Sequence, residues 1–283
     1  MPNILANGIR IYYEERGTGP AMVWAHGLAG TWQGWEGVMD FFQDRFRVIA
    51  YDARGHGRSE IPDQPEAYSQ DIMVEDMRGI LDALGIARAI VGGHSMGANV
   101  ALNFALKYPK RCLGVIPVGI GSGSSDAEWW QKWWDKLADL AEQKGMAAFL
   151  EEMKKLPAWA SALADPKMGK EIGQIVLANS AKAIAYTVRG VQKKRPNIFQ
   201  LQPKLEKLPV ATLIVLSEGD TPVLECSRFM AKHIPKATLE IIPAKSHWTF
   251  TEAPEKFLQA VDRFVTWLIA EQSRLPLSRQ GKD

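Results

Sequence analysis

Short apolar runs alternate along the chain with longer amphipathic stretches, and several of the runs end in Gly or Asp. Such runs predict buried strands, and the stretches between them predict helices. The predicted strands are Ala21–Ala25, Arg47–Tyr51, Ala89–Gly92, Leu113–Val118, Ala211–Ser217 and Thr238–Ile242, with a hairpin before them around Ile4–Glu14. This alternation is typical of an α/β fold, in which helices flank a mostly parallel sheet.

The strand pattern stops between Ser122 and Leu208, where only helical patterns remain. Those patterns cover Asp126–Lys144, Met146–Lys155 and Lys167–Gln192, with Ser125 and Glu128 as a possible capping box for the first of them. Prolines at 157, 166, 196 and 203 mark the joints. An all-helical insertion between two strands of one sheet predicts a cap over the loops at the sheet's edge. We therefore expect residues 1–121 and 208–283 to form an α/β core domain and residues 122–207 to form a helical cap.

The composition fits a folded globular chain. Of its 283 residues, 46% are hydrophobic and 23% are charged, which supports a sizeable core and argues against intrinsic disorder. The formal net charge of +2 shows no electrostatic footprint for nucleic acid. Cys112 and Cys226 have no disulfide-like spacing, and we find no signal peptide and no membrane span. We expect a cytoplasmic protein, monomeric or homodimeric, that binds neither membranes nor nucleic acid.

Gly93-His-Ser-Met-Gly97 has the G-x-S-x-G pattern, and it lies between an apolar run and a helix-like segment. A strand-turn-helix of this kind is a nucleophile elbow, in which a tight turn exposes the Ser hydroxyl. The small residues Gly93 and Gly97 relieve crowding on both sides of Ser95. We therefore predict that Ser95 is a catalytic nucleophile.

A Ser hydroxyl needs a base to activate it and a third group to orient that base. In a doubly wound sheet these groups follow the carboxyl ends of strands. His247 comes directly after the strand Thr238–Ile242, whereas His233 lies at the end of a helix and near the opposite edge of the sheet. His94 points away from Ser95 in the turn and is expected to be structural.

The loop after Ala211–Ser217 offers Glu218 and Asp220 as the orienting acid. We favour Asp220, because it lies between Gly219 and Thr221-Pro222, which suit a sharp turn at the end of a strand. Asp126 is a reserve candidate, although its place beside a helix start explains it without catalysis. The resulting chain order is Ser95, Asp220, His247, unlike the orders of chymotrypsin-type and subtilisin-type enzymes.

An acyl-transfer enzyme also stabilises an oxyanion with hydrogen-bond donors. The turn His26-Gly-Leu-Ala-Gly30 follows the strand Ala21–Ala25 and offers the Leu28 amide. The Met96 amide, which opens the helix after Ser95, is the second predicted donor.

Together these motifs resemble the α/β-hydrolase fold superfamily, specifically serine hydrolases with a helical cap. The motifs that carry the resemblance are His26-Gly27, Asp52–Ser59, Gly93–Gly97, Asp220 and His247. Two departures are Ala98 and Ser246, where relatives often have Gly. The resemblance implies a structural role for the Asp52–Ser59 loop. Dehalogenases and epoxide hydrolases that resemble this chain use Asp in the elbow, so Ser95 argues against both activities.

The predicted function is the hydrolysis of carboxylic esters or lactones of small, largely apolar molecules through an acyl-enzyme. We expect no cofactor and no metal. C–C bond hydrolysis of ring-fission products, cofactor-free perhydrolysis and ligand reception by the same fold remain alternatives, because the framework is shared.

Aromatic residues are the candidates for contacting the substrate. Trp129, Trp130, Trp133 and Trp134 are placed to share a broad face of the first cap helix. We name Trp32, Trp129, Trp133 and Trp248 as substrate-binding residues, with Trp35 and Trp159 as further candidates. No carboxylate-binding Arg stands out. Arg189 is the one considered, and a solvated position on its helix explains it better.

Overall fold

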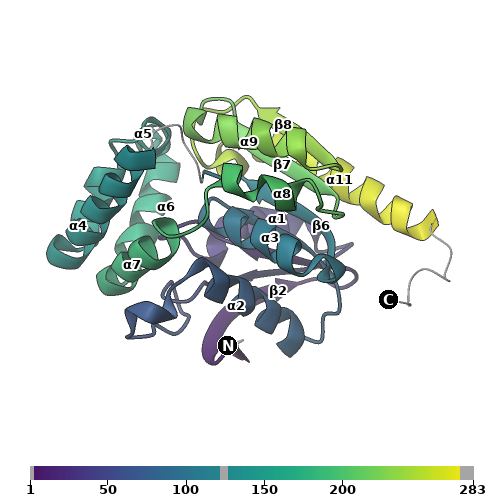
Figure 1. Cartoon of the computed structure of the whole chain (residues 1–283), viewed down its shortest axis with the longest axis horizontal. Helices are drawn as coiled ribbons and strands as arrows, with labels where there is room; N and C mark the ends of the chain where they lie inside the picture. The colour runs from purple at the N-terminus through teal and green to yellow at the C-terminus, as the bar shows by residue number, and fades with distance from the viewer. Residues whose placement is uncertain (1–2, 122–126, 275–283) are drawn as a thin grey trace.

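A twisted sheet forms the centre of the computed structural model, which describes residues 3–121 and 127–274 (Figure 1). Within those residues the strand order is β1-β2-β4-β3-β5-β6-β7-β8. The strands are β1 (Asn3–Ala6), β2 (Ile9–Arg16), β3 (Ala21–Ala25), β4 (Arg47–Tyr51), β5 (Ala89–His94), β6 (Cys112–Val118), β7 (Thr212–Ser217) and β8 (Ala237–Ile242). The β1-β2 hairpin pairs antiparallel at one edge, and β3 to β8 pair parallel. The predicted α/β fold class is confirmed.

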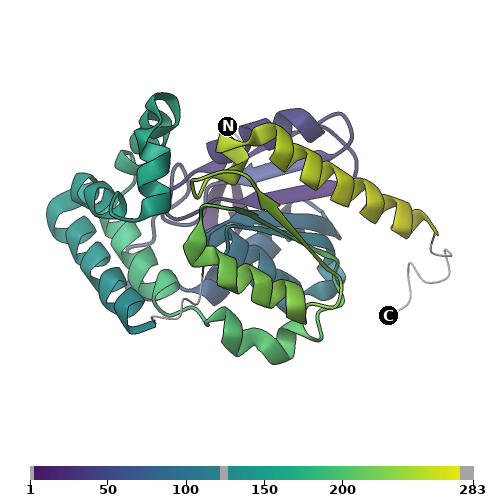
Figure 2. The same ribbon diagram turned by 90° about the horizontal axis from the view of Figure 1, so that it is seen from above.

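Helices cover both faces of this sheet (Figure 2). One face packs against α1 (Glu36–Phe42) and α11 (Pro254–Arg274). The other packs against α2 (Gln70–Ala83), α3 (Met96–Lys107) and α9 (Thr221–His233). Side chains alternate between the two cores along β3, since Met22 and Trp24 join the first core and Val23 joins the second. Both faces are therefore buried, which is why the central strands read as continuous apolar runs.

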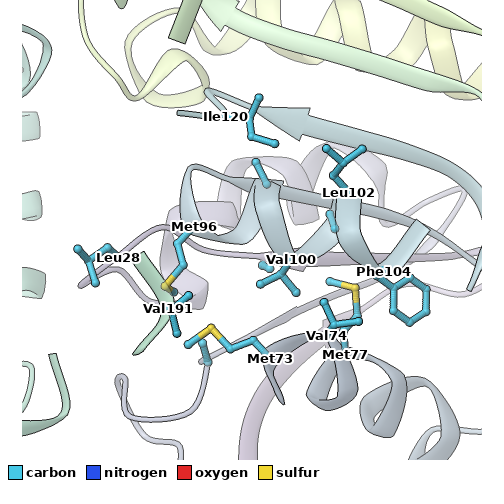
Figure 3. Close-up of a cluster of buried hydrophobic side chains, with 14 of the residues drawn as sticks. Leu28, Met73, Val74, Met77, Met96, Val100, Leu102, Phe104, Ile120 and Val191 are labelled. Carbon is cyan, nitrogen blue, oxygen red and sulfur yellow. The ribbon is translucent and has the colours of Figure 1, made fainter. Parts of the chain in front are cut away.

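The core on the α2 and α3 face includes Met96, the residue that follows Ser95. Figure 3 shows Met96, Val100 and Phe104 along α3 together with Met73 and other apolar side chains of α2. This packing holds the amino-terminal end of α3 in a fixed position.

Between β6 and β7 every described element is helical, and we call residues 127–205 the helical insertion. It contains α4 (Ala127–Met153), α5 (Pro157–Ala164), α6 (Pro166–Leu177), α7 (Ala181–Thr187), a π turn (Val188–Gln192), a 3₁₀ turn (Ile198–Leu201) and α8 (Gln202–Leu205). In Figure 1, α4 to α7 gather at one side of the sheet. The short remaining elements are 3₁₀ turns at Trp32–Trp35, Pro65–Ala67 and Pro109–Arg111, and α10 (Thr249–Glu252).

Two predicted features of the insertion differ from the structure. The stretch Lys167–Gln192 is not one helix, because Ser180 caps a new one by accepting a hydrogen bond from the Ala183 amide at 3.4 Å. Helix α5 was absent from the prediction. By contrast, Gly145 has a positive φ of 79° and breaks α4 at the predicted joint between Lys144 and Met146. Ser125 and Asp126 lie outside the described residues.

None of the helices in the described ranges combines the length and apolar character that crossing a membrane requires.

Candidate active site

Ser95 occupies a strained turn between β5 and α3. Its φ of 52° and ψ of −105° lie outside the regions that L-residues favour, and its side chain does not cap α3. A Cβ added at Gly97 would lie 2.2 Å from the Ala25 carbonyl oxygen, and one added at Gly93 would lie 2.4 Å from the Gly97 carbonyl. No side chain fits at either position, so the predicted reason for both glycines is confirmed.

The His247 imidazole pairs with the Asp220 carboxylate. His247 Nδ1 lies 2.5 Å from Asp220 Oδ2, and both side chains are buried. Asp220 follows β7 and His247 follows β8, so the sheet itself brings them together. A neutral imidazole that donates from Nδ1 keeps the lone pair on Nε2, which is the acceptor that a general base needs.

The end of β6 connects this pair to Ser95. The Ser95 amide donates to the Val118 carbonyl at 2.9 Å. The next residue, Gly119, leaves so little room that an added Cβ would lie 3.2 Å from His247 Cε1. Ser95, Asp220 and His247 all line one cavity.

His94 supports the loop that carries His247. Its Nε2 donates to the His247 carbonyl at 2.9 Å, and the two rings lie 4.4 Å apart. Burial holds the pKa of His94 well below its ordinary value, so the ring stays neutral and keeps one donor for this bond. The position agrees with the structural role expected for His94. His233 lies away from the cavity, paired with Glu206.

The helical insertion also contacts the His247 loop. The His247 amide donates to the Ala158 carbonyl of α5 at 3.4 Å. The rings of Trp159 and Trp248 meet edge to face, with centroids 4.5 Å apart. A backbone hydrogen bond and a side-chain contact from α5 therefore hold the loop that carries His247.

The turn after β3 is fixed by His26. Its Nε2 accepts from the Ala53 amide at 2.9 Å, and its Nδ1 lies 2.7 Å from the Gly27 carbonyl. Burial lowers the pKa of His26 to about 4, which keeps the ring neutral for this arrangement. Within the described residues, no acceptor is found for the Leu28 or Met96 amide. Leu28 lines the cavity, and Met96 begins α3, where helix amides lack intrahelical partners.

The cavity lies between loops at the carboxyl ends of the strands and the helical insertion. Its volume is about 130 Å³ and its walls are mostly apolar. An apolar protein cavity of about 150 Å³ holds a benzene-sized molecule, so this space suits a small substrate part. Among the described residues, no cluster of His, Cys, Asp or Glu could hold a metal ion.

The tryptophans that line the cavity are only partly those predicted. Trp248 is on the wall, as are the further candidates Trp35 and Trp159. The α4 tryptophans on the wall are Trp130 and Trp134, which lie four residues apart on one side of the helix.

Trp129, Trp133 and Trp32 are not on the cavity wall, and the prediction for them is corrected. Trp129 faces solvent and Trp133 packs in the core, because the neighbouring side of α4 turns away from the cavity. Trp32 is held at a different surface, where its amide donates to Asp52 Oδ1 at 2.8 Å.

The loop from Asp52 to Ser59 has a structural role. Asp52 accepts from the amides of Trp32 and Arg58, and Arg54 forms a buried ion pair with Asp76. The loop braces the turn after β3, because the Ala53 amide donates to His26 Nε2 and Asp52 accepts from the Trp32 amide.

Sequence reasoning missed two polar residues of the insertion that line the cavity, Gln192 and Arg195. Arg189 instead pairs with Asp139 and Glu142 at the surface of the insertion, as its sequence suggested. Arg195 belongs to the basic run Lys193-Lys-Arg195, which resembles a solvated segment, and its spacing of three from Gln192 is the only sequence signal for a shared face.

Comparisons with known proteins identify the fold family. Residues 20–254 match the alpha/beta hydrolase fold family. The putative carbamate hydrolase RutD of Caulobacter sp. (strain K31) is 31% identical over 265 residues, covering 90% of this chain and 96% of that protein. The enol-lactonase from Burkholderia xenovorans LB400 superposes with a TM-score of 0.83 at 25% identity, covering 94% of this chain and 100% of the other. A thermophilic esterase from Thermogutta terrifontis, solved with malate bound, has the same TM-score at 26% identity, covering 94% and 98%.

Proposed function

The chain belongs to the α/β hydrolase fold family, and we propose that it hydrolyses a carboxylic ester or lactone through an acyl-enzyme on Ser95. An enol-lactonase and an esterase among the solved relatives support acyl transfer as the reaction class. The helical insertion acts as the cap of the site.

In the first step His247 Nε2 accepts the Ser95 proton while Ser95 Oγ attacks the carbonyl carbon. The carbonyl π electrons move to the oxygen, which becomes the oxyanion of a tetrahedral intermediate. Asp220 holds the imidazole in the tautomer that leaves Nε2 free and stabilises the imidazolium that forms.

The oxyanion then accepts hydrogen bonds from the Leu28 and Met96 amides. Such a donor contributes about 3 kcal/mol to the stability of the transition state. When the intermediate collapses, the bond to the leaving oxygen breaks and the imidazolium gives that oxygen its proton. Water, deprotonated by His247, cleaves the acyl-enzyme by the same sequence and restores Ser95.

One observation carries this proposal. The buried His247–Asp220 pair and the strained Ser95 line the same cavity, although they lie far apart in the chain. Backbone strain at a non-glycine residue persists only where the surrounding structure imposes it, and here the glycines on either side make the turn possible.

Labelling and kinetics test the proposal together. An organophosphonate should add one adduct to the wild-type protein, located at Ser95 by peptide mass spectrometry, and Ser95→Ala should remain unlabelled. Ser95→Ala should also lose at least about 10⁴-fold in kcat on any ester or lactone that the wild type hydrolyses. Ser180→Ala, which removes only a helix cap, is the control and should keep its activity. Full activity in Ser95→Ala, or a label on another residue, would refute the assignment.

A further inference from the structure

Arg195 reaches the cavity from the last part of the helical insertion. It follows the π turn Val188–Gln192, and its backbone amide donates to the carbonyl of Val191 in that turn at 3.0 Å. Its guanidinium Nη2 donates to the Gly121 carbonyl at 3.1 Å. Gly121 is two residues beyond Gly119, the residue that abuts His247. The hydrogen bond thus holds the guanidinium next to residues 119–121, which follow β6 and lie against His247.

No carboxylate of the described residues neutralises this guanidinium. Arg195 forms no ion pair there, and Nη1 is shielded from solvent without any protein acceptor within hydrogen-bonding distance. By contrast, the fully buried Arg54 pairs with Asp76, and Arg189 pairs with two carboxylates at the surface. Arg195 as a whole is partly buried, with Nη1 fully shielded from solvent. Enclosing part of a guanidinium without a counterion destabilises a fold, so this position calls for an explanation.

The charge itself remains on Arg195 at neutral pH. Burial lowers its pKa to about 10, which still leaves the guanidinium protonated. Apart from Asp220, which is paired with His247, Arg195 carries the only formal charge among the described residues that line the cavity. Among the described residues, the cavity therefore has mostly apolar walls and one positive side chain, Arg195, that no carboxylate neutralises.

Gln192 lies one helical turn before Arg195 and faces the same cavity. It is buried, and its Oε1 has no hydrogen-bond donor among the described residues. A 180° rotation about the last side-chain torsion of Gln192 exchanges Oε1 and Nε2, and so places the NH₂ group where Oε1 lies now. Arg195 and Gln192 can then offer a pair of donors, which is the usual recognition chemistry for a carboxylate.

We propose that Arg195 and Gln192 form a carboxylate-binding subsite, and that the substrate is a short ester or lactone that bears a second, ionised carboxyl group. This inference rests on the proposed function, because it takes the cavity at Ser95 as the place of reaction. A bound carboxylate would supply the counterion that Arg195 lacks among the described residues. The small cavity limits the spacer between the two carbonyl carbons to a few methylene groups.

A purely structural role for Arg195 makes a different prediction. If its bond to Gly121 only holds the insertion in place, replacing Arg195 would impair all substrates alike. A carboxylate subsite instead separates charged substrates from uncharged ones of the same shape.

The experiment uses mono-4-nitrophenyl glutarate and its uncharged counterpart, in which the free carboxylate is replaced by a primary amide. We expect the wild type to prefer the charged ester, and Arg195→Met to lose about 100-fold in kcat/KM on it, mainly through KM. On the amide, Arg195→Met should stay within about 3-fold of the wild type. Arg195→Lys should recover part of the preference, and Arg189→Met, which removes a surface arginine of the same insertion, should change neither rate. Equal losses on both esters, or no preference in the wild type, would overturn the subsite.

Binding separates this inference from the proposed function. Calorimetry should show glutarate binding to Ser95→Ala and no binding to Ser95→Ala combined with Arg195→Met. If neither ester is turned over but this pattern holds, the subsite stands and the proposed reaction is wrong. If esters are hydrolysed through Ser95 but Ser95→Ala does not bind glutarate, the reaction stands and the subsite is wrong.

Discussion

Gly97→Ala adds one methyl group at the point where α3 approaches the end of β3. The new Cβ would lie 2.2 Å from the Ala25 carbonyl oxygen and 2.7 Å from the His26 carbonyl oxygen, whereas ordinary contact begins at 3.4 Å. Both obstacles are backbone atoms, so no side chain can rotate aside. The start of α3 must therefore move by about 1 Å.

The movement has separate effects on stability and on catalysis. Overpacking of this kind destabilises a fold by about 1–3 kcal/mol, and better helix propensity of Ala offsets up to about 1 kcal/mol of that. Ser95 and the Met96 amide belong to the displaced segment, whereas His247 belongs to another loop. A misplacement of about 1 Å reduces catalysis by about 100-fold, so we expect a larger loss of activity than of stability.

Urea unfolding and kcat/KM on the best ester measure the two effects. Gly37→Ala is the matched control, because Gly37 is also the second residue of a helix and nothing lies within 4 Å of its added Cβ. This control should gain about 0.5–1 kcal/mol and retain full activity. Wild-type activity in Gly97→Ala would show that the close contact does not position the elbow, and would refute the reasoning.

Two further predictions concern stability. Arg54→Met removes the positive partner of the buried Asp76, which among the described residues keeps only its hydrogen bond from Asn7 Nδ2, and should lower the free energy of unfolding by about 3–5 kcal/mol. Arg78→Met, in an exposed pair, should cost at most about 1 kcal/mol, and similar urea midpoints for the two variants would contradict this. Burial lowers the pKa values of His26 and His56 to about 4 and about 3, so the unfolded chain binds more protons below about pH 6.5. Stability should therefore fall as the pH drops from 6.5 towards 4, by up to about 1.4 kcal/mol per pH unit for each histidine, and equal free energies of unfolding at pH 7.5 and 5 would rule this out.

The central strands were predictable because both faces of the sheet are buried. Strands such as Ala21–Ala25 and Arg47–Tyr51 have the same bounds in the sequence prediction and in the structure. The loop positions of Asp220 and His247 followed from the same logic, since parallel strands place their carboxyl ends at one edge. Their catalytic roles stay a prediction, as does the domain division at residues 122 and 208.

The cavity wall could not be predicted in the same way. Trp129 with Trp133 and Trp130 with Trp134 form two equally good stripes on α4, and only packing against the core decides which stripe turns inward. Arg195 was missed because its basic neighbours indicate a solvated segment. Its position at the cavity depends on how the insertion folds back onto Gly121, which is a contact between residues 74 positions apart.

The contact between α5 and the loop of residue 247 bears on recombination between relatives. Because an amide-to-carbonyl bond and a pair of indoles join the two segments, they form one mechanical unit assembled from distant stretches of polypeptide. A chimera that takes the helices between β6 and β7 from a relative would lose these contacts. Its His247 imidazole would then be positioned less well. Exchanging α5 together with the loop that contains His247 and Trp248 would keep the contacts between them. A chimera designed to alter selectivity should therefore exchange both segments.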